Sequence, residues 1–203
     1  HCFACGKVVQ IDELFDFLGV EHNFDPAISR QIKPKVVTLT TTQTLYKPQL
    51  PFRFSPYLAQ RGIGEEVQKR FKIYEKDNRV YMPVFDRDGK YLYVNSRCTD
   101  RKQFYVEGGA VKTLWGIEEI DFSRPIVVCE GQVDAMSFWE LGMQAVATLG
   151  VGNIRALNAI KTATNIIILA FDGDEAGRQA IKKAGRLLGT FRCRYVEFPE
   201  GKD

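Results

Sequence analysis

Alternation of short apolar runs with helical patterns, from residue 125 onward, is the feature that most constrains the fold. The apolar runs predict buried strands at 125–129, 145–149, 165–171 and 191–198. Helical patterns separate them, at 133–141, 154–162 and 176–188. Strands and helices that alternate with short loops predict a parallel sheet with helices on its faces. Residues that carry chemistry in such sheets gather at the carboxyl ends of the strands.

The stretch before residue 125 predicts a smaller α+β subdomain. Ser55 to Gly62 is typical of a short helix with a serine cap, proline at its first position and a glycine stop, and a second helix is expected at 64–71. Two alternating runs, 79–85 and 90–95, are joined by Asp86-Arg87-Asp88-Gly89, which predicts a hairpin. The two aspartates resemble a metal pair, but Asp caps its own turn and Gly supplies positive φ, so turn chemistry is the favoured interpretation.

The N-terminal segment carries half of a zinc-type pattern. Cys2 and Cys5 form a Cys-x2-Cys turn followed by glycine, which directs two thiolates at one metal. Tetrahedral zinc needs four ligands, and no second Cys/His pair follows, so we expect the other two before residue 1. Two free thiols are the alternative interpretation. A helix is expected at 11–18, and the proline-rich, threonine-rich stretch that follows predicts a linker whose one candidate strand is 35–38.

These patterns divide the chain into four expected parts. They are the end of a zinc-binding module at 1–22, a linker at 23–54, a basic subdomain at 55–122 and an α/β catalytic domain at 123–203.

Composition excludes several classes of protein. No apolar run approaches the roughly 20 residues that cross a bilayer, and no signal-peptide pattern is present, so we expect a cytoplasmic protein without a membrane partner. The odd count of five cysteines argues against a disulfide framework, and Cys98, Cys129 and Cys193 are expected to be buried thiols. The net charge of +3 is too small to indicate a nucleic-acid partner by itself.

Acidic residues follow two of the predicted strands. Glu130 comes directly after the first, and Asp172-Gly173-Asp174 after the third. Clustered carboxylates repel one another and raise one another's pKa, and a divalent cation relieves that repulsion. Hard oxygen ligands suit Mg²⁺ or Mn²⁺, and Asp134, one helical turn after Glu130, is expected to face the same site. The alternative is a nucleotide-binding or response-regulator-like sheet whose acids are incidental.

Two motifs resemble those of the Toprim domain. Residues 128–135 are similar to its glutamate motif, and 170–178 to its Asp-x-Asp motif, with about forty residues between the acids. A Leu-Gly turn at 148–150 falls between them, as in primases. The resemblance implies a parallel, Rossmann-like sheet and metal binding by Glu130, Asp172 and Asp174. Residues 198–203 resemble the segment that follows in the family, which implies a further ligand at Asp203.

The basic subdomain resembles that of bacterial and phage DNA primases. Residues 57–63, 79–89 and 113–117 are similar to successive primase segments, and 61–112 carries a surplus of four positive charges. The resemblance implies template or nucleotide contacts at Arg79, Arg97 and Lys102, with Lys112 as a further candidate. Ala110 and Tyr105 depart from the family pattern, which favours a phage or mobile-element origin.

The implied function is the synthesis of short RNA primers on single-stranded DNA during replication. The resemblance further implies nucleotidyl transfer by a DNA-directed RNA polymerase, with Mg²⁺ or Mn²⁺ at the acids and Zn²⁺ in a complete zinc module. The implied partners are single-stranded DNA, ribonucleoside triphosphates and a replicative helicase of the primosome, in a bacterial cell or a phage-infected host. The alternatives are DNA cleavage by a Toprim nuclease or topoisomerase, and a non-catalytic recombination mediator.

Overall fold

The computed structural model describes residues 52–107, 110, 113–163 and 166–198. The chain divides into two units, His1–Tyr46 and Lys47–Asp203, and every described residue belongs to the second. Several predictions therefore lie outside the described residues, namely those for Cys2, Cys5, Lys112 and Asp203 and for the elements at 11–18 and 35–38.

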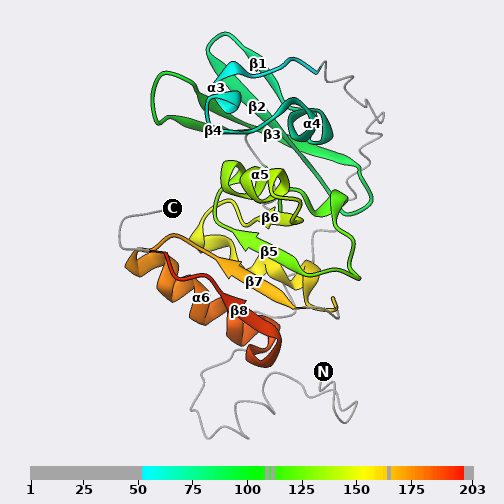
Figure 1. Cartoon of the computed structure of the whole chain (residues 1–203), viewed down its shortest axis with the longest axis vertical. Coiled ribbons are helices and arrows are strands. Elements are labelled where there is room, and N and C mark those ends of the chain that lie inside the picture. The colour runs from blue at the N-terminus through cyan, green and yellow to red at the C-terminus, as the bar shows by residue number, and fades with distance from the viewer. Residues whose placement is uncertain (1–51, 108–109, 111–112, 164–165, 199–203) are drawn as a thin grey trace, which may run out of the picture. The chain divides into compact units, whose positions relative to one another are not determined.

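The first part of the described chain is an antiparallel sheet with two short helices. Its strands are β1 (Tyr74–Lys76), β2 (Arg79–Phe85), β3 (Tyr91–Cys98) and β4 (Phe104–Val106), in the order β1-β2-β3-β4 (Figure 1). Helix α3 (Pro56–Ala59) begins at Ser55, whose hydroxyl accepts from the Leu58 N–H at 3.2 Å, and α4 (Glu65–Arg70) follows. Asp86 Oδ1 accepts from two backbone N–H groups in the β2–β3 turn, which confirms the turn interpretation.

The second part is a parallel sheet of order β6-β5-β7-β8. Its strands are β5 (Ile126–Cys129), β6 (Ala145–Ala147), β7 (Ile167–Ala170) and β8 (Cys193–Tyr195), and its helical elements are η1 (Ile117–Glu119), α5 (Gln132–Glu140), η2 (Val151–Ile160), α6 (Glu175–Leu188) and η3 (Thr190–Arg192). None of the helices in the described residues is long and apolar enough to cross a membrane.

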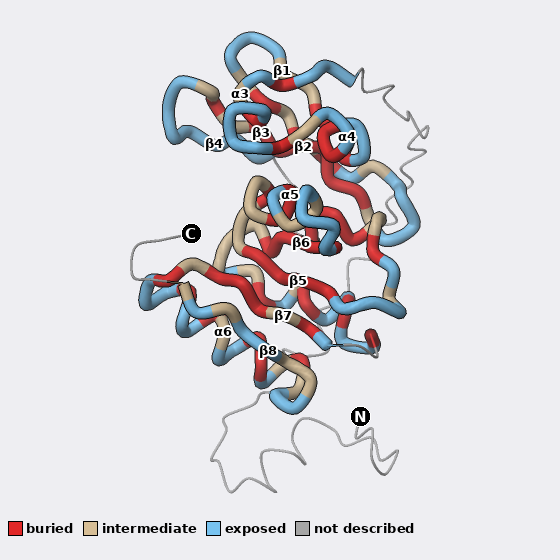
Figure 2. The backbone as a smooth tube through the Cα atoms, in the orientation of Figure 1, coloured by how far each residue is buried: buried red, intermediate tan, exposed pale blue. Residues whose placement is uncertain are grey.

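Alternate residues of β5 enter two different cores. Val127 and Cys129 pack with Ala135 and Met136 of α5, whereas the side chains of Ile126 and Val128 pack with residues of η2 and α6. Helices therefore cover both faces of the sheet, and its strands β5, β6 and β7 are largely buried, whereas the edge strand β8 is not (Figures 1 and 2). The predicted fold class, a parallel α/β domain preceded by a smaller α+β subdomain, is confirmed.

One predicted helix has a different form. The segment expected as a helix at 154–162 is the 3₁₀ element η2, Val151–Ile160, which begins earlier and bends at Asn153 (φ −99°, ψ 28°). The Asn153 side chain donates to the Thr148 carbonyl at 2.8 Å, so it bonds backwards to the chain that leaves β6. Side chains that bond locally to backbone in this way compete with regular helix.

Trp115 joins the two sheets. It is fully buried, its Nε1–H donates to the Pro83 carbonyl of β2 at 2.9 Å, and its ring contacts Phe71 with centroids 4.3 Å apart. Its backbone exchanges two hydrogen bonds with Ala147 of β6, at 2.9 and 3.0 Å. One residue thus bonds to both subdomains, which fixes the antiparallel sheet against the parallel one.

A buried carboxyl next to this joint gives a test of the packing. Burial raises the pKa of Glu118 to about 7, with Glu119 and Asp86 adding smaller increases, and its Oε2 is buried without a hydrogen-bond partner in the described residues. The folded protein holds this proton where the unfolded chain has lost it. Stability is therefore expected to fall as pH rises from 4.5 to about 7.

Glu118→Gln should remove this loss and stabilise the protein at pH 8 by about 1 to 3 kcal/mol relative to wild type. Urea unfolding at several pH values measures the difference. Glu119→Gln, whose carboxylate pairs with Arg70 at 3.2 Å, is the control and should reduce the slope much less than Glu118→Gln, because Glu119 contributes only a smaller part of the raised pKa. A slope that Glu118→Gln leaves unchanged would contradict the assignment.

Candidate functional site

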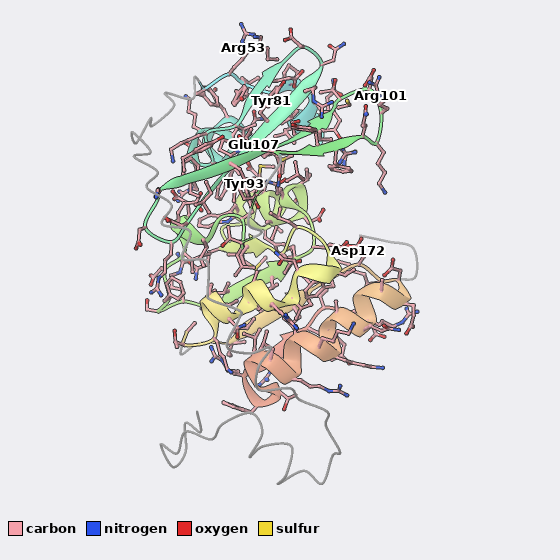
Figure 3. All side chains as sticks on the ribbon, turned by 180° about the vertical axis from the view of Figure 1, so that it is seen from behind. Arg53, Tyr81, Tyr93, Arg101, Glu107 and Asp172 are labelled. Carbon is pink, nitrogen blue, oxygen red and sulfur yellow. The ribbon has the colours of Figure 1, made fainter. Side chains whose placement is uncertain are left out.

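Acidic residues gather at the carboxyl ends of β5 and β7. Glu130 directly follows β5, Asp172 lies two residues after β7, and Asp174 caps α6. Because Cys129 pairs with Ala170 in parallel register, the chain leaves both strands at the same edge of the sheet. Figure 3 shows Asp172 where β7 gives way to α6. The structure therefore brings these three predicted residues to one edge.

The electrostatics show that the acids share one neighbourhood. Burial raises the pKa of Glu130, and the negative charges of Asp172, Asp174 and Asp134 raise it further, while a hydrogen bond with the Val151 backbone opposes them. Burial also raises the pKa of the Cys129 thiol, helped by Asp134 and Asp172. Asp134 thus lies close enough to Glu130 to raise its pKa, and its place in a metal site stays a prediction.

Two of these carboxylates also cap helices. Asp134 Oδ2 accepts from the Gly131 N–H at 3.0 Å at the start of α5, and Asp174 Oδ1 accepts from the Gly177 N–H at 2.7 Å at the start of α6. These bonds hold the two side chains by one oxygen each. The first turns of α5 and α6 therefore fix where the Asp134 and Asp174 carboxylates lie.

The acidic group offers hard oxygen ligands without forming a closed cage. No set of three or more His, Cys, Asp or Glu side chains in the part of the chain that the structure describes is arranged to hold a metal ion. Mg²⁺ binds through one or two carboxylates and keeps several waters or phosphate oxygens, so it does not require such a cage. The accumulated negative charge around Glu130 and its oxygen donors fit an ion of this kind.

Two hollows open onto the acids. One, of about 290 Å³, is lined from the parallel sheet by Glu130, Gln132 and Leu149, and from the antiparallel sheet by Asn95, Phe104 and Tyr105. The other, of about 320 Å³, is lined by Arg61 together with Asp134 and Asp172. Acids of the parallel sheet thus face residues of the preceding subdomain on both sides.

Aromatic rings hold two arginines of that subdomain. The Arg97 guanidinium lies over the rings of Tyr57 and Phe104, at 5.3 and 5.2 Å, and Arg61 lies over Tyr57 at 5.0 Å. Neither arginine forms an ion pair with another described residue. Sequence reasoning identified Arg97 but missed Arg61, although Arg61 lies in a segment that it compared with primases.

The other predicted basic residues lie in different surroundings. Arg79 donates to Ser96 Oγ and to Cys98 Sγ, so its guanidinium is bound within the sheet. Lys102 is exposed in the loop between β3 and β4, beside Arg101 (Figure 3). Their roles as template or nucleotide contacts, like that of Arg97, stay predictions.

Comparison with known proteins identifies the parallel domain. Residues 127–203 match the family model described as Toprim-like. DNA primase of Haemophilus influenzae is 24% identical in an alignment that covers 100% of this chain and 48% of the relative, and the DNA helicase/primase of Enterobacteria phage T3 is 31% identical over 70% of this chain and 27% of the relative. The chain is a relative of the Toprim-containing DNA primases.

Solved primase structures share the fold. The primase fragment of the bacteriophage T7 primase-helicase has a TM-score of 0.64 and 25% identity, with 75% of this chain and 67% of that chain covered. The Aquifex aeolicus primase, with zinc-binding and RNA polymerase domains, has a TM-score of 0.61 and 22% identity, with 72% and 50% covered. This primase relative spans about half the length, or less, of the first curated relatives it matches.

Gly177 of α6 lies in close contact with the backbone of Asp172. A Cβ at Gly177 would overlap the Asp172 carbonyl oxygen and lie 3.0 Å from the carbonyl carbon, and neither backbone atom can move without displacing Asp172. Gly177→Ala should therefore cost about 2 to 3 kcal/mol of stability. Chemical denaturation measures this change.

Gly185→Ala in the same helix is the matched control. A Cβ there meets only the Thr190 methyl at 3.7 Å, an ordinary contact, so the substitution should be neutral or stabilise α6 by up to about 1 kcal/mol. Equal losses for the two variants would show that the close approach to Asp172 is not the cause.

Proposed function

We propose that this chain is the core of a DNA primase, which synthesises short RNA primers on single-stranded DNA by metal-dependent nucleotidyl transfer. The observation that carries the proposal is the convergence of Glu130, Asp172 and Asp174 at one edge of the parallel sheet. Arg61, from the preceding subdomain, lines a hollow with one of these acids. The sequence relatives named DNA primase support the same activity.

The acidic residues are proposed to bind metal ions, and the basic residues to bind phosphates. Glu130, Asp172 and Asp174 would hold Mg²⁺ or Mn²⁺, with Asp134 nearby and Asp203 as a further proposed ligand. A bound ion of this kind supplies positive charge for the α-phosphate and the leaving pyrophosphate. The carboxylates are negatively charged and repel phosphate groups. Anionic substrates would therefore approach from the side of the cationic subdomain.

The basic side chains would bind phosphates. Aromatic rings, rather than carboxylates of described residues, hold Arg61 and Arg97, so both guanidinium groups are available to phosphate oxygens. Lys102 and Arg101, exposed in the β3–β4 loop, extend the cationic surface along which single-stranded DNA would lie. Arg79 and Lys112 are further proposed contacts.

The proposed partners follow the same relatives. The phage T3 relative is a DNA helicase/primase, so we include a replicative helicase, either separate or in the same chain, with single-stranded DNA and ribonucleoside triphosphates. A zinc-binding domain is part of the Aquifex structure, which supports zinc binding by Cys2 and Cys5 in a complete module.

Asp172→Asn should abolish primer synthesis while single-stranded DNA binding is retained or slightly tightened, because the change removes a metal ligand and a negative charge. Incorporation of labelled ribonucleotides on a single-stranded template, with Mg²⁺ or Mn²⁺, measures the first effect. Fluorescence anisotropy of a labelled oligonucleotide measures the second.

The same assay separates the rival activities. Cleavage of the template without synthesis would indicate a Toprim nuclease or topoisomerase. DNA binding with neither synthesis nor cleavage would indicate a non-catalytic mediator. Either result from the wild-type chain would overturn the proposal.

Arg97→Ala and Lys102→Ala should weaken single-stranded DNA binding and reduce its salt dependence. Each lost phosphate contact is expected to lower the slope of log K against log salt by about 0.7. Lys183→Ala, at an exposed position of α6, is the control and should change neither quantity. An unchanged slope in the Arg97 and Lys102 variants would place the DNA elsewhere.

A further inference from the structure

Two amide side chains line the hollow beside Glu130, and each has one buried polar atom without a hydrogen-bond partner in the described residues. Asn95 of β3 is 7% exposed and Gln132 of α5 is 8% exposed. Asn95 Oδ1 and Gln132 Nε2 are buried, and neither has a partner in the described ranges of the chain. The two residues reach the hollow from different subdomains.

Such groups are costly to leave unpaired. A buried amide without a partner loses its hydrogen bonds to water and gains none in return, so folded proteins keep few of them. An apolar side chain of similar size at either position would avoid that loss. Retention of two in one hollow, next to an acidic site, points to a ligand that completes them.

The chemistry of the pair narrows the ligand. One unpaired atom is an acceptor and the other is a donor. A hydroxyl group both donates and accepts, so a single hydroxyl can donate to Asn95 Oδ1 and accept from Gln132 Nε2. Phosphate oxygens only accept, so they could not donate to Asn95 Oδ1.

The remaining lining agrees with a nucleoside. Phe104 and Tyr105, 57% and 60% exposed, border the same hollow and offer ring surfaces to a base. Glu130, at the opposite wall, belongs to the acidic group that would engage the phosphates. A sugar between a base and its phosphates would therefore lie near the amides.

We propose that Asn95 and Gln132 form a subsite for the ribose 2′-hydroxyl of a nucleotide bound beside Glu130, so that the site prefers ribonucleotides to deoxyribonucleotides. The inference rests on the proposed function, since it places a nucleoside triphosphate at this edge of the sheet. It assigns the choice of sugar to two uncharged residues that take no part in binding metal or phosphate.

The test compares ATP with 2′-deoxyATP. Affinities are measured by calorimetric titration of the whole chain with each nucleotide and Mg²⁺, without template. Wild type should bind ATP about 5- to 15-fold more tightly, the value of one or two hydrogen bonds to a neutral hydroxyl. Asn95→Leu and Gln132→Met should lower ATP affinity to the 2′-deoxyATP level and leave 2′-deoxyATP binding unchanged.

Gln179→Met is the matched control, because it makes the same chemical change at an exposed position of α6 and should keep the wild-type preference. Thermal unfolding of Asn95→Leu and Gln132→Met should occur at the wild-type temperature or about 2 to 4 °C above it, since an unpaired buried amide is removed. That result would exclude misfolding as the cause of a lost preference.

Three results would overturn the subsite. They are equal losses for ATP and 2′-deoxyATP, an unchanged preference in both variants, and a loss that differs between ATP and CTP while the sugar preference persists, which would assign the amides to the base. Primer synthesis is assayed separately. A chain that makes primers but binds both sugars equally loses only the subsite, and one that prefers ATP but makes no primers loses only the primase assignment.

Discussion

The parallel pairing of β5 with β7 is the constraint on which the candidate site depends. Because Cys129 lies opposite Ala170, the residues that follow each strand emerge together, and Glu130 meets Asp172 and Asp174 although they are far apart in sequence. The buried strands leave no freedom to slide, since a shift of one residue would exchange the side chains of the two cores. Carboxylate repulsion at that edge is therefore a consequence of hydrophobic packing.

Sequence patterns predicted the features that depend on local chemistry. The serine cap of α3, the Asp86 turn and the acids at strand ends each follow from residues within a few positions of one another. The cluster of Arg61, Tyr57 and Arg97 does not, because it joins α3 to β3 and no periodicity records a contact between distant segments. The burial of Gln132 is not predicted either, since a polar residue in a first helical turn is usually exposed, whereas Gln132 is 8% exposed and lines a hollow with residues of β3 and β4.

The acidic group and the two ring-bound arginines lie on different subdomains. A carboxylate occupies the N–H donors of the arginine that it pairs with, whereas an aromatic ring holds an arginine in place and leaves those donors free. Tyr57 and Phe104 hold Arg61 and Arg97 in this second way. The negative charges of Asp172, Asp174 and Asp134 add to burial in raising the pKa of Glu130. Negative charge thus gathers on the parallel sheet, while the two arginines lie on the preceding subdomain.

Such a site is destabilising, and the joint at Trp115 explains how the fold tolerates it. Repelling carboxylates and unpaired amides favour opening of the hollow, because water would then solvate them. Trp115 opposes that opening, since its ring is buried against Phe71, its indole bonds to β2 and its backbone bonds to β6. If Trp115 stays packed on Phe71 and β2, separating the subdomains breaks its two backbone bonds to Ala147. The apolar core thus forms the hollow in the free protein. Binding of a ligand would therefore not have to supply the free energy of assembling it.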